Sequence, residues 1–570
     1  MSGCCGAFTG LARVLASAIR RGQICSPLCE LTEPLPDIVV EYDVVIPTSE
    51  GKLLANIYKS KSMLQRGEKH PVVMCMHPYD NHITPALGKT PLKGCPQQYR
   101  LIPQAGKPRF STQTSWESPD PNFWVANGYA VVNLNAPGYA GSEGKPTAFQ
   151  DSQAKAYYEA IEWVAAQDWC TGSVGLNGVS FLAITQYHVA TCRAYGGKAP
   201  PSLKCISPWE GVSDPRETFM QNGIPEVGFL AFWWVTEVQP VLTSGKPQDF
   251  IDSVGAKPPD WPNMSDAWWA EMCADVHNIR VPMLICASFS DHGLHTAGSL
   301  RAFTGASTKD KWLYTHRTGK WDAYYSCEVQ ALTLKFFDYF VKGIDNGWRT
   351  DTPPVRLEVR SARDVVHEVR SETTWPLPAT QYTKLFLQAS RALGVQPPSQ
   401  PAEVCYSGKG GSVAFVFPFT EPTELTGHFA LELVVEVRGA PDMAVFAAAR
   451  KLDKNGVFVP FRGSTGLTED AVTRGCMLAS LRELDQKKTK AHLPAISYKR
   501  SPVTPGKKMQ LSMWMEASST FFEAGEAIEL VLSSKEIVLT GPYVKSLCGN
   551  TGTHVVHVGD SYLLVPKIQK

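Results

Sequence analysis

A strand that turns sharply into a helix at Ser180 is the local feature that most constrains how this chain of 570 residues folds. The apolar stretch 173–177 predicts a buried strand, and apolar residues recur at helical spacing directly after the serine. Such a tight bend crowds the backbone, so the residue two positions before the serine must be small, and it is Gly178. The second glycine usual in this turn is replaced by Leu182. The pattern predicts a nucleophile turn, with a helix-capping serine beside a turn glycine as the alternative.

Apolar strands alternate with amphipathic helices on both sides of this turn, which predicts a parallel sheet covered by helices. A helix that is expected to start near Gln150 carries six residues on one face: Ala154, Tyr157, Tyr158, Ile161, Val164 and Ala165. The expected strands are 71–77, 129–134, 173–177, 281–287 and 311–315.

Aromatic residues concentrate between about 208 and 278 and interrupt the alternation. An insertion at this point of such a sheet lies over the carboxyl ends of the strands, where ligands bind. We therefore expect a helical cap in which Phe232, Trp233 and Trp234 line an apolar pocket. The alternative is that these rings form the cap's own core.

Short strands replace the alternating pattern in the last part of the chain. Five apolar residues alternate along one of them, and 453–456 reads as a hairpin turn. The apolar positions are Phe429, Leu431, Leu433, Val435 and Val437. This pattern predicts an all-β sandwich or jelly roll.

The charges nearly cancel, with 55 basic and 54 acidic residues, so the sequence shows no electrostatic signature of nucleic-acid binding. It also shows no apolar run of the ~18 residues that a membrane span needs. We therefore expect a small-molecule substrate as the partner, with no nucleic acid and no membrane. The sequence does not indicate an oligomeric state.

The 15 cysteines have no repeated spacing and predict reduced, mostly buried thiols. Cys4, Cys5, Cys25 and Cys29 lack the spacing of a zinc finger, so we predict no metal and no other cofactor. Residues 1–29 carry basic side chains and no acidic one, which fits either an organelle presequence or a simple N-terminal helix. The default prediction is a cytoplasmic protein.

A serine hydroxyl becomes a nucleophile only beside a histidine base, which in turn needs an acid to fix its tautomer. On a sheet of this kind the acid and the base follow the nucleophile at the ends of later strands. Asp291 lies just beyond the strand 281–287, and His316 immediately follows the strand 311–315. The sequence therefore predicts a catalytic triad of Ser180, Asp291 and His316.

Other histidines are weaker candidates for the base. His292 and His295 share a loop with Asp291, where a base would compete with its own orienting acid for position. His188 lies on the helix after the turn, and the histidines from His367 onward lie in the β region. Asp214 is the fallback acid.

Three motifs occur in a fixed order: the turn 178–182, the stretch Ser288-Phe289-Ser290-Asp291 after a Val-Pro-x-Leu strand, and Thr315-His316 before an aromatic helix that ends at Gly343. Together they resemble the CocE/NonD hydrolases, a family of cocaine esterase-like and Xaa-Pro dipeptidyl-peptidase-like enzymes. The resemblance covers roughly residues 40–560. Its C-terminal part, similar to the family's jelly roll, rests on 442–446, 478–484 and 522–525.

The resemblance implies an acyl-enzyme mechanism. Ser180 would attack the acyl carbonyl, His316 would transfer the proton, and Asp291 would orient the histidine. The resemblance also implies an oxyanion hole made by the backbone N–H of Phe181 and the hydroxyl of Tyr79, which matches the tyrosine of the family's Pro-Tyr element.

We therefore predict an α/β-hydrolase fold with a helical cap, followed by an all-β jelly roll of the galactose-binding type. The predicted function is a serine hydrolase that cleaves a small or medium apolar acyl ester, such as a natural-product intermediate. An acyltransferase with the same triad, an Xaa-Pro dipeptidyl-peptidase and a non-catalytic binding module remain alternatives. The predicted segments are an N-terminal extension (1–38), the hydrolase core (39–207 and 279–350), the cap (208–278) and the jelly roll (351–570).

Overall fold

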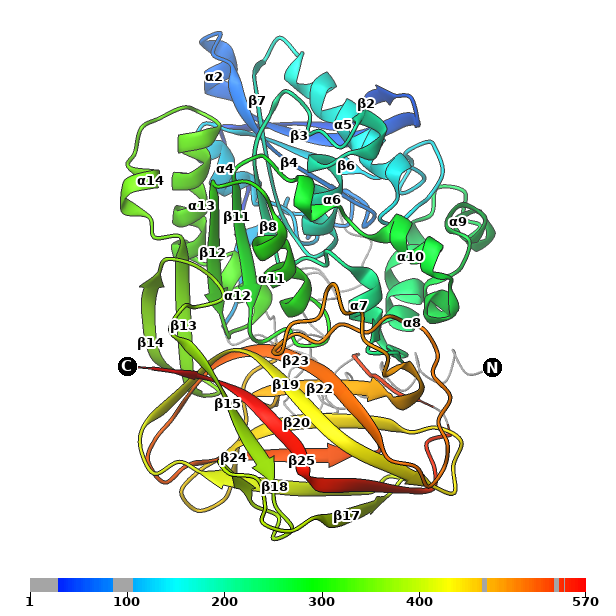
Figure 1. The fold of residues 1–570 in the computed structure, drawn as a ribbon. Helices are drawn as coiled ribbons and strands as arrows, with labels where there is room; N and C mark the ends of the chain where they lie inside the picture. Colours follow the sequence, from blue (N-terminus) through cyan, green and yellow to red (C-terminus); the bar gives the residue numbers. More distant parts are fainter. Residues whose placement is uncertain (1–28, 86–105, 464–468, 538–542, 548, 570) are drawn as a thin grey trace. The chain divides into compact units, whose positions relative to one another are not determined.

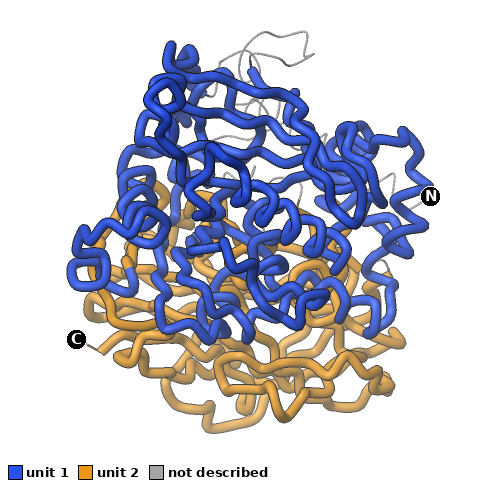
Figure 2. The backbone as a smooth tube through the Cα atoms, turned by 90° about the horizontal axis from the view of Figure 1, so that it is seen from above, with its two compact units in different colours: residues 1–215, 229–288, 298–355 blue, residues 216–228, 289–297, 356–570 orange. Residues whose placement is uncertain are grey.

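The computed structural model describes residues 29–85, 106–463, 469–537, 543–547 and 549–569. The chain forms two compact units, which Figure 2 colours separately. The α/β unit comprises residues 1–215, 229–288 and 298–355, and the sandwich unit comprises residues 216–228, 289–297 and 356–570. The sandwich unit therefore includes two short segments that the sequence assigned to the cap and the core. Residues 1–28, including Cys4, Cys5 and Cys25, lie outside the described part of the chain.

The α/β unit is built on a predominantly parallel sheet. Its strand order is β12 (Lys311–His316), β11 (Met283–Ser288), β8 (Leu203–Trp209), β7 (Cys170–Val179), β4 (His70–His77), β6 (Ala130–Asn135), β3 (Gly51–Ser60) and β2 (Ile38–Thr48). The six strands from β12 to β6 run parallel, whereas β3 and β2 are antiparallel to their neighbours. The predicted parallel sheet is thus confirmed, and its strands lie within a few residues of the expected ranges.

Helices flank this sheet (Figure 1). Helices α4 (Pro121–Ala126) and α13 (Cys327–Phe340) lie on one side, and α5 (Asp151–Ala165) and α6 (Phe181–Ala190) lie on the other. Trp124 and Phe337 from the first pair share a buried core with strand residues such as Val73. Helix α13 approaches β7 closely because Gly175 faces it, and a Cβ atom there would lie 2.6 Å from the Phe337 ring. Four of the six residues predicted for the inner face of α5 are buried, whereas Tyr158 and Ala165 at the borders of this face are half-buried.

The chain between β8 and β11 is mainly helical. Within the α/β unit it contains α8 (Phe229–Trp233), α9 (Pro247–Val254) and α10 (Asp266–Met272), together with shorter helical turns. The Trp261 ring lies 6.1 Å from that of Trp233 and 5.7 Å from that of Trp268, measured between centroids. Many of the aromatic rings in this segment thus contact one another.

The sandwich unit has two sheets. The first contains β16 (Leu393–Gly394), β15 (Thr380–Leu387), β25 (Thr553–Ile568), β19 (Thr423–Arg438), β23 (Met509–Phe522) and β13 (Val355–Ala362), with β14 (Val365–Glu372) beside β13 and β17 (Ala402–Ser407) beside β25. The second contains β18 (Ser412–Pro418), β24 (Ala527–Ser533), β20 (Ala444–Leu452) and β21 (Phe458–Val459), with β22 (Thr473–Leu478) beside β20. Both sheets contribute to one buried core, which includes the five alternating residues of β19. The β-rich C-terminal region is confirmed, while its jelly-roll topology stays a prediction.

Two expectations about the chain as a whole can be compared with the structure. Cys29 forms a disulfide bond, so the prediction of reduced thiols is wrong at this residue. The spacing of cysteines along a chain does not reveal which thiols the fold brings together. Among the described residues, no helix is long and apolar enough to cross a membrane.

Candidate active site

Ser180 lies at a strained turn between β7 and α6. Its backbone has φ 59° and ψ −115°, a conformation that residues with side chains rarely adopt. Its N–H donates to the carbonyl of Trp209 (3.0 Å), and its carbonyl accepts from the N–H of Ile184 (3.0 Å). These bonds tie the turn to β8 on one side and to α6 on the other. The fold therefore holds the serine at the carboxyl end of β7.

Gly178 and Leu182 account for the unusual sequence of this turn. Gly178 has φ 151°, and a Cβ atom on it would lie 2.6 Å from the Cβ of Leu182. Any larger residue at position 178 would collide with the leucine. The turn accommodates Leu182 in place of the usual second glycine because Gly178 leaves it room.

Tyr79 and Phe181 lie side by side next to this turn. Tyr79 follows β4, and its ring meets the Phe181 ring edge-on at a centroid distance of 6.0 Å. Its main-chain N–H donates to Nδ1 of His77 (3.2 Å). Phe181 is the first residue of α6, so its N–H is one of the helix N-terminal groups without an intrahelical partner.

The Tyr79 hydroxyl remains protonated at neutral pH. Burial raises the pKa of Tyr79 well above its usual value, and the carboxylates of Glu117 and Glu237 raise it further. A hydrogen bond with the Trp233 side chain acts in the opposite direction. The phenol is therefore available as an O–H donor.

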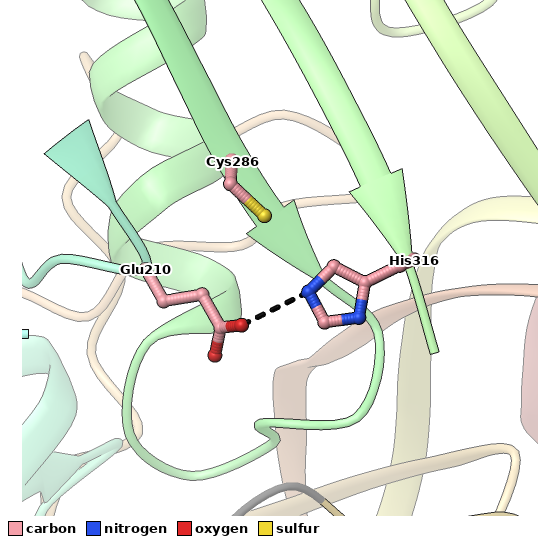
Figure 3. A group of neighbouring side chains, drawn as sticks. All are labelled: Glu210, Cys286 and His316. Atoms are coloured by element: carbon pink, nitrogen blue, oxygen red, sulfur yellow. Dashed lines mark hydrogen bonds and ion pairs between the residues drawn. The ribbon is translucent and has the colours of Figure 1, made fainter. Parts of the chain in front are cut away.

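Glu210 and His316 form a buried pair at the carboxyl ends of β8 and β12 (Figure 3). The His316 Nε2 atom lies 3.0 Å from Oε1 of Glu210, and the two side chains are 1% and 0% exposed. The Glu210 carboxylate can accept a hydrogen bond from Nε2, and the main-chain nitrogen of Thr318 lies 3.2 Å from Nδ1. Glu210 has φ 51°, so its backbone is strained like that of Ser180.

Cys286 on β11 lies beside this pair (Figure 3). The ligand atoms of Glu210, Cys286 and His316 all lie within 4.8 Å of one another. A carboxylate, a thiolate and an imidazole form a ligand set that suits a transition metal such as Zn²⁺. The Lys320 ammonium lies 3.7 Å from Oε2 of Glu210, however, and its positive charge opposes a cation at this position.

Glu117 adds a second buried carboxyl group beside the serine turn. Its Oε1 accepts a hydrogen bond from the indole N–H of Trp321 (3.0 Å). Burial raises the pKa of Glu117 to about 8, although Lys320 and the Trp321 hydrogen bond lower it, and Glu237 and Glu210 raise it further. The carboxyl groups of Glu117 and Glu210 therefore both interact with Lys320.

Asp291 lies in the segment 289–297 of the sandwich unit. Its carboxylate makes a short hydrogen bond with Nδ1 of His295, and the two side chains are 1% and 2% exposed. Within the α/β unit, Ser288 at the end of β11 is the register partner of His316 on β12. The segment with Asp291 thus begins directly after a residue that lies beside the predicted base, and the pairing of Asp291 with His316 stays a prediction.

The three predicted pocket residues have different surroundings. The Trp233 ring lies 6.1 Å from that of Phe181, beside the serine turn. The Trp234 ring packs against Phe250 of α9 at 5.1 Å. Phe232 is half-buried. Only Trp233 of these three is thus described in contact with a residue of the turn, and all three remain predictions as substrate contacts.

The sequence analysis did not select Glu210, Glu117 or Lys320 as residues of the catalytic site. Glu210 directly follows β8, so it satisfies the same strand-end rule that pointed to Asp291. The predicted start of the cap at residue 208 concealed this, because β8 continues to Trp209. Glu117 and Lys320 lie outside the sheet strands, and no local pattern marks them.

Two family models match consecutive parts of the chain. Residues 51–322 match X-Pro dipeptidyl-peptidase (S15 family), and residues 346–563 match the X-Pro dipeptidyl-peptidase C-terminal non-catalytic domain. The second match covers most of the sandwich unit, which is therefore a separate, mostly β, non-catalytic domain in this classification.

Three relatives cover much of the chain. The crystal structure of a CocE/NonD family hydrolase from Staphylococcus aureus has 32% sequence identity and a TM-score of 0.85, covering 93% of this chain and 94% of that one. A cocaine esterase from Rhodococcus sp. is 26% identical over 372 residues, which are 55% of this chain and 62% of the esterase. A putative Xaa-Pro dipeptidyl-peptidase from Bacillus anthracis is 22% identical over 554 residues, covering 90% of this chain and 85% of that protein.

Proposed function

We propose that this chain, which belongs to the CocE/NonD family of serine hydrolases, cleaves small or medium apolar acyl esters through a covalent acyl-enzyme. The observation that carries the proposal is the backbone of Ser180, which has φ 59° at the strand-to-helix turn. Backbone strain at a residue with a side chain persists only where the surrounding structure enforces it, and it concentrates at functional sites.

The proposed reaction has two halves. In the first, Ser180 Oγ attacks the acyl carbonyl carbon while His316 takes the hydroxyl proton and passes it to the departing alkoxide. In the second, water attacks the acyl-enzyme, His316 takes a proton from the water, and Ser180 is released with its hydroxyl restored. Asp291 fixes the orientation of His316 in this proposal.

The oxyanion of each tetrahedral intermediate would accept hydrogen bonds from the Phe181 N–H and the Tyr79 hydroxyl. The raised pKa of Tyr79 supports this role, because the phenol keeps its proton at neutral pH. The aromatic rings beside the turn support an apolar acyl group: the Phe181 ring lies 4.9 Å from that of Phe149 and 6.1 Å from that of Trp233.

Covalent labelling tests this proposal. We expect a fluorophosphonate probe to modify Ser180, as located by peptide mass spectrometry, and p-nitrophenyl butyrate to be hydrolysed. Ser180→Ala should remove both signals, whereas Ser207→Ala, which removes a fully buried serine hydroxyl on neighbouring β8, should keep them. A folded chain with neither labelling nor turnover would contradict the proposal and favour a binding module.

Product analysis separates hydrolysis from acyl transfer, because both use the same acyl-enzyme. The enzyme is given p-nitrophenyl butyrate together with an added alcohol or amine. Free butyrate as the main product supports the hydrolase, and the butyryl ester or amide of the added acceptor would assign the chain to the acyltransferases.

A second candidate function is an aminopeptidase-like activity on substrates with a free amino group. The observation that favours it is the group of carboxyl side chains beside the serine turn, in which Glu210 and Glu237 raise the pKa of Glu117. A substrate ammonium would relieve this repulsion, and dipeptidyl-peptidases need an anionic site for the substrate's amino terminus.

The amino group itself supplies the test. We compare Ala-Pro p-nitroanilide with its N-acetyl form, which differs only in lacking the charge. A kcat/KM at least about thirtyfold higher for the free amine, reduced in Glu117→Gln, would support the second candidate, because a close charge pair of this kind is worth about 2–5 kcal/mol. Equal or absent cleavage of the two compounds would exclude it.

A further inference from the structure

The segment 289–297 of the sandwich unit, which carries Asp291, is anchored by charged side chains of the sandwich. This segment follows β11 but packs with the β-rich unit. The anchoring groups come from β22, from β23 and from the residues just before β22 and just after β24. The contacts concern the two residues that follow Asp291, namely His292 and Gly293.

Arg474 on β22 is the centre of this anchor. Its Nη2 donates to the carbonyl of His292 (2.6 Å), and its Nη1 donates to Oε1 of Glu536 (2.9 Å). Its Nε lies 3.2 Å from Oδ1 of Asp470. One guanidinium thus joins the main chain of the segment to two carboxylates. The planar fork of arginine suits such simultaneous contacts, whereas a lysine ammonium cannot reproduce their geometry.

The segment has two further attachments to the sandwich. The Gly293 N–H donates to Oε1 of Glu516 on β23 (2.9 Å). The fully buried His292 ring lies between Asp470, 3.1 Å from Nδ1, and the Ala517 carbonyl, 3.0 Å from Nε2. Gly293 has φ 87°, and a Cβ atom on it would lie 3.3 Å from Nη2 of Arg474.

The contacts that anchor this segment are charge-assisted and buried, and two of them are directed at its main chain. Hydrogen bonds to ionised groups are shorter and stronger than neutral ones. Arg474, Asp470 and Glu516 are all at least nine-tenths buried. The anchor therefore restricts the backbone of residues 292 and 293, and with it the position of the adjacent Asp291.

We propose that Arg474 and Glu516 are positioning residues for the reaction, since they hold the Asp291 carboxylate in place through the main chain of segment 289–297. This inference rests on the proposed function, in which Asp291 orients His316. Catalytic side chains must be held within about 0.5 Å of their productive geometry, so a loosened segment lowers the rate of the chemical step more than substrate binding. The sandwich unit thus contributes to catalysis without supplying a group that touches the substrate.

The test uses the full-length chain with p-nitrophenyl butyrate as substrate. We expect Arg474→Met and Glu516→Ala each to lower kcat about ten- to a hundredfold with KM changed less than threefold. Glu516→Gln, which keeps an acceptor oxygen for the Gly293 N–H, should restore most of the activity lost in Glu516→Ala. The matched control is Arg450→Met, which breaks the Arg450–Glu529 pair between β20 and β24 (2.8 Å) away from the segment and should leave kcat unchanged.

Hydrogen–deuterium exchange supplies a readout that does not depend on turnover. Peptides covering 289–297 should exchange at least about fivefold faster in folded Arg474→Met and Glu516→Ala, with unchanged exchange in the Arg450→Met control. Unchanged exchange, or faster exchange with unchanged kcat, would overturn the proposal. Failure of the proposed function itself is recognised separately, because the unmutated chain would then show neither turnover nor labelling of Ser180.

Discussion

Each of the two units contains a buried carboxylate–histidine pair, and the two pairs are held in different ways. In the α/β unit, Glu210 and His316 lie at the ends of β8 and β12, so the sheet itself fixes their separation. In the sandwich unit, Asp291 and His295 are four residues apart in one short segment, so their pairing is local. That segment is held from outside, by Arg474 and Glu516. The comparison indicates that the histidine on the sheet is rigidly placed, whereas the position of Asp291 depends on its anchors.

The largest expected effect distinguishes the two histidines. We expect His316→Ala to lower kcat for p-nitrophenyl butyrate by about 10⁴-fold or more, as removal of a triad base does. His295→Ala removes the local partner of Asp291 and should lower kcat by less than about tenfold. Steady-state kinetics and fluorophosphonate labelling measure both changes. If His295→Ala proved the more damaging, Asp291–His295 would be the working pair of the molecule.

The next largest effect on kcat distinguishes the carboxylates of Asp291 and Glu210. Asp291→Asn removes the charge predicted to orient His316, and we expect kcat to fall by about 10³- to 10⁴-fold. Glu210→Gln keeps an acceptor oxygen opposite His316 Nε2 and removes only the charge, so we expect a decrease of about tenfold. Circular dichroism checks that both variants fold. The reverse order of effects would transfer the role of orienting acid to Glu210.

Local sequence patterns were sufficient for most of the fold. Alternation along β19 placed Phe429, Leu431 and Leu433 in the core, and helical spacing placed four of six predicted residues of α5 there. Both patterns depend only on neighbours in the chain. The strained turn at Ser180 was also predictable, since Gly178 is the residue that the crowding there demands.

The side-chain partners of the candidate site residues could not be predicted in the same way, because they depend on contacts between segments that are distant in the sequence. The strand-end rule selects Glu210 as well as Asp291, and no local pattern decides which of them faces His316. The attachment of segment 289–297 to the sandwich unit rests on Arg474 and Glu516, which are nearly two hundred residues or more away in sequence. A charged residue inside a β-strand also reads as a solvent-facing position, so nothing marked Arg474 as buried.

Tyr79→Phe tests the proposed oxyanion donor and is expected to have an intermediate effect. The substitution removes one hydroxyl and keeps the ring against Phe181. We expect kcat to fall by about 10²-fold, within the range found for loss of one such donor, with little change in KM. Tyr139→Phe is the control, because this buried hydroxyl instead donates to the carbonyl of Thr147 (2.9 Å). A decrease of less than threefold in Tyr79→Phe would remove Tyr79 from the oxyanion hole.

The raised pKa of Glu117 in the α/β unit also leads to a prediction of how the free energy of unfolding depends on pH. Burial raises the pKa of Glu117 to about 8, so this group binds its proton more tightly in the folded chain than in the unfolded one. Its contribution to the free energy of unfolding is complete below the unfolded pKa of about 4.5 and is lost as the pH rises towards 8. Glu117→Gln can still accept from the Trp321 indole but cannot ionise. Relative to the unmutated chain, this variant should therefore gain about 4 kcal/mol of stability between pH 5 and pH 8.5.

Differential scanning calorimetry at the two pH values measures this change. The control is Glu159→Gln, because hydrogen bonds from Ser49 and Tyr195 outweigh the effect of burial and lower the pKa of Glu159. Since the sign of the shift is opposite, Glu159→Gln should lose stability relative to the unmutated chain as its carboxylate ionises and should gain none at high pH. A pH-independent difference for Glu117→Gln would show that Glu117 is already ionised in the folded chain.

The smallest expected effect concerns Trp233 and Trp234, two adjacent residues of the helical insertion. Replacing each in turn compares a ring beside the serine turn with a ring inside the insertion. Trp233 lies beside Phe181 at the serine turn, whereas Trp234 packs against Phe250. We expect Trp233→Ala to change the ratio of kcat/KM for p-nitrophenyl hexanoate and acetate by about three- to tenfold, because loss of one apolar pocket contact changes acyl-chain discrimination by about 1 kcal/mol, the lower end of the usual range. Trp234→Ala should lower the melting temperature and leave this ratio unchanged. An unchanged ratio in Trp233→Ala would place both rings in the core of the insertion, and acyl selectivity would then have to come from residues nearer to Ser180, such as Phe149 or Phe181.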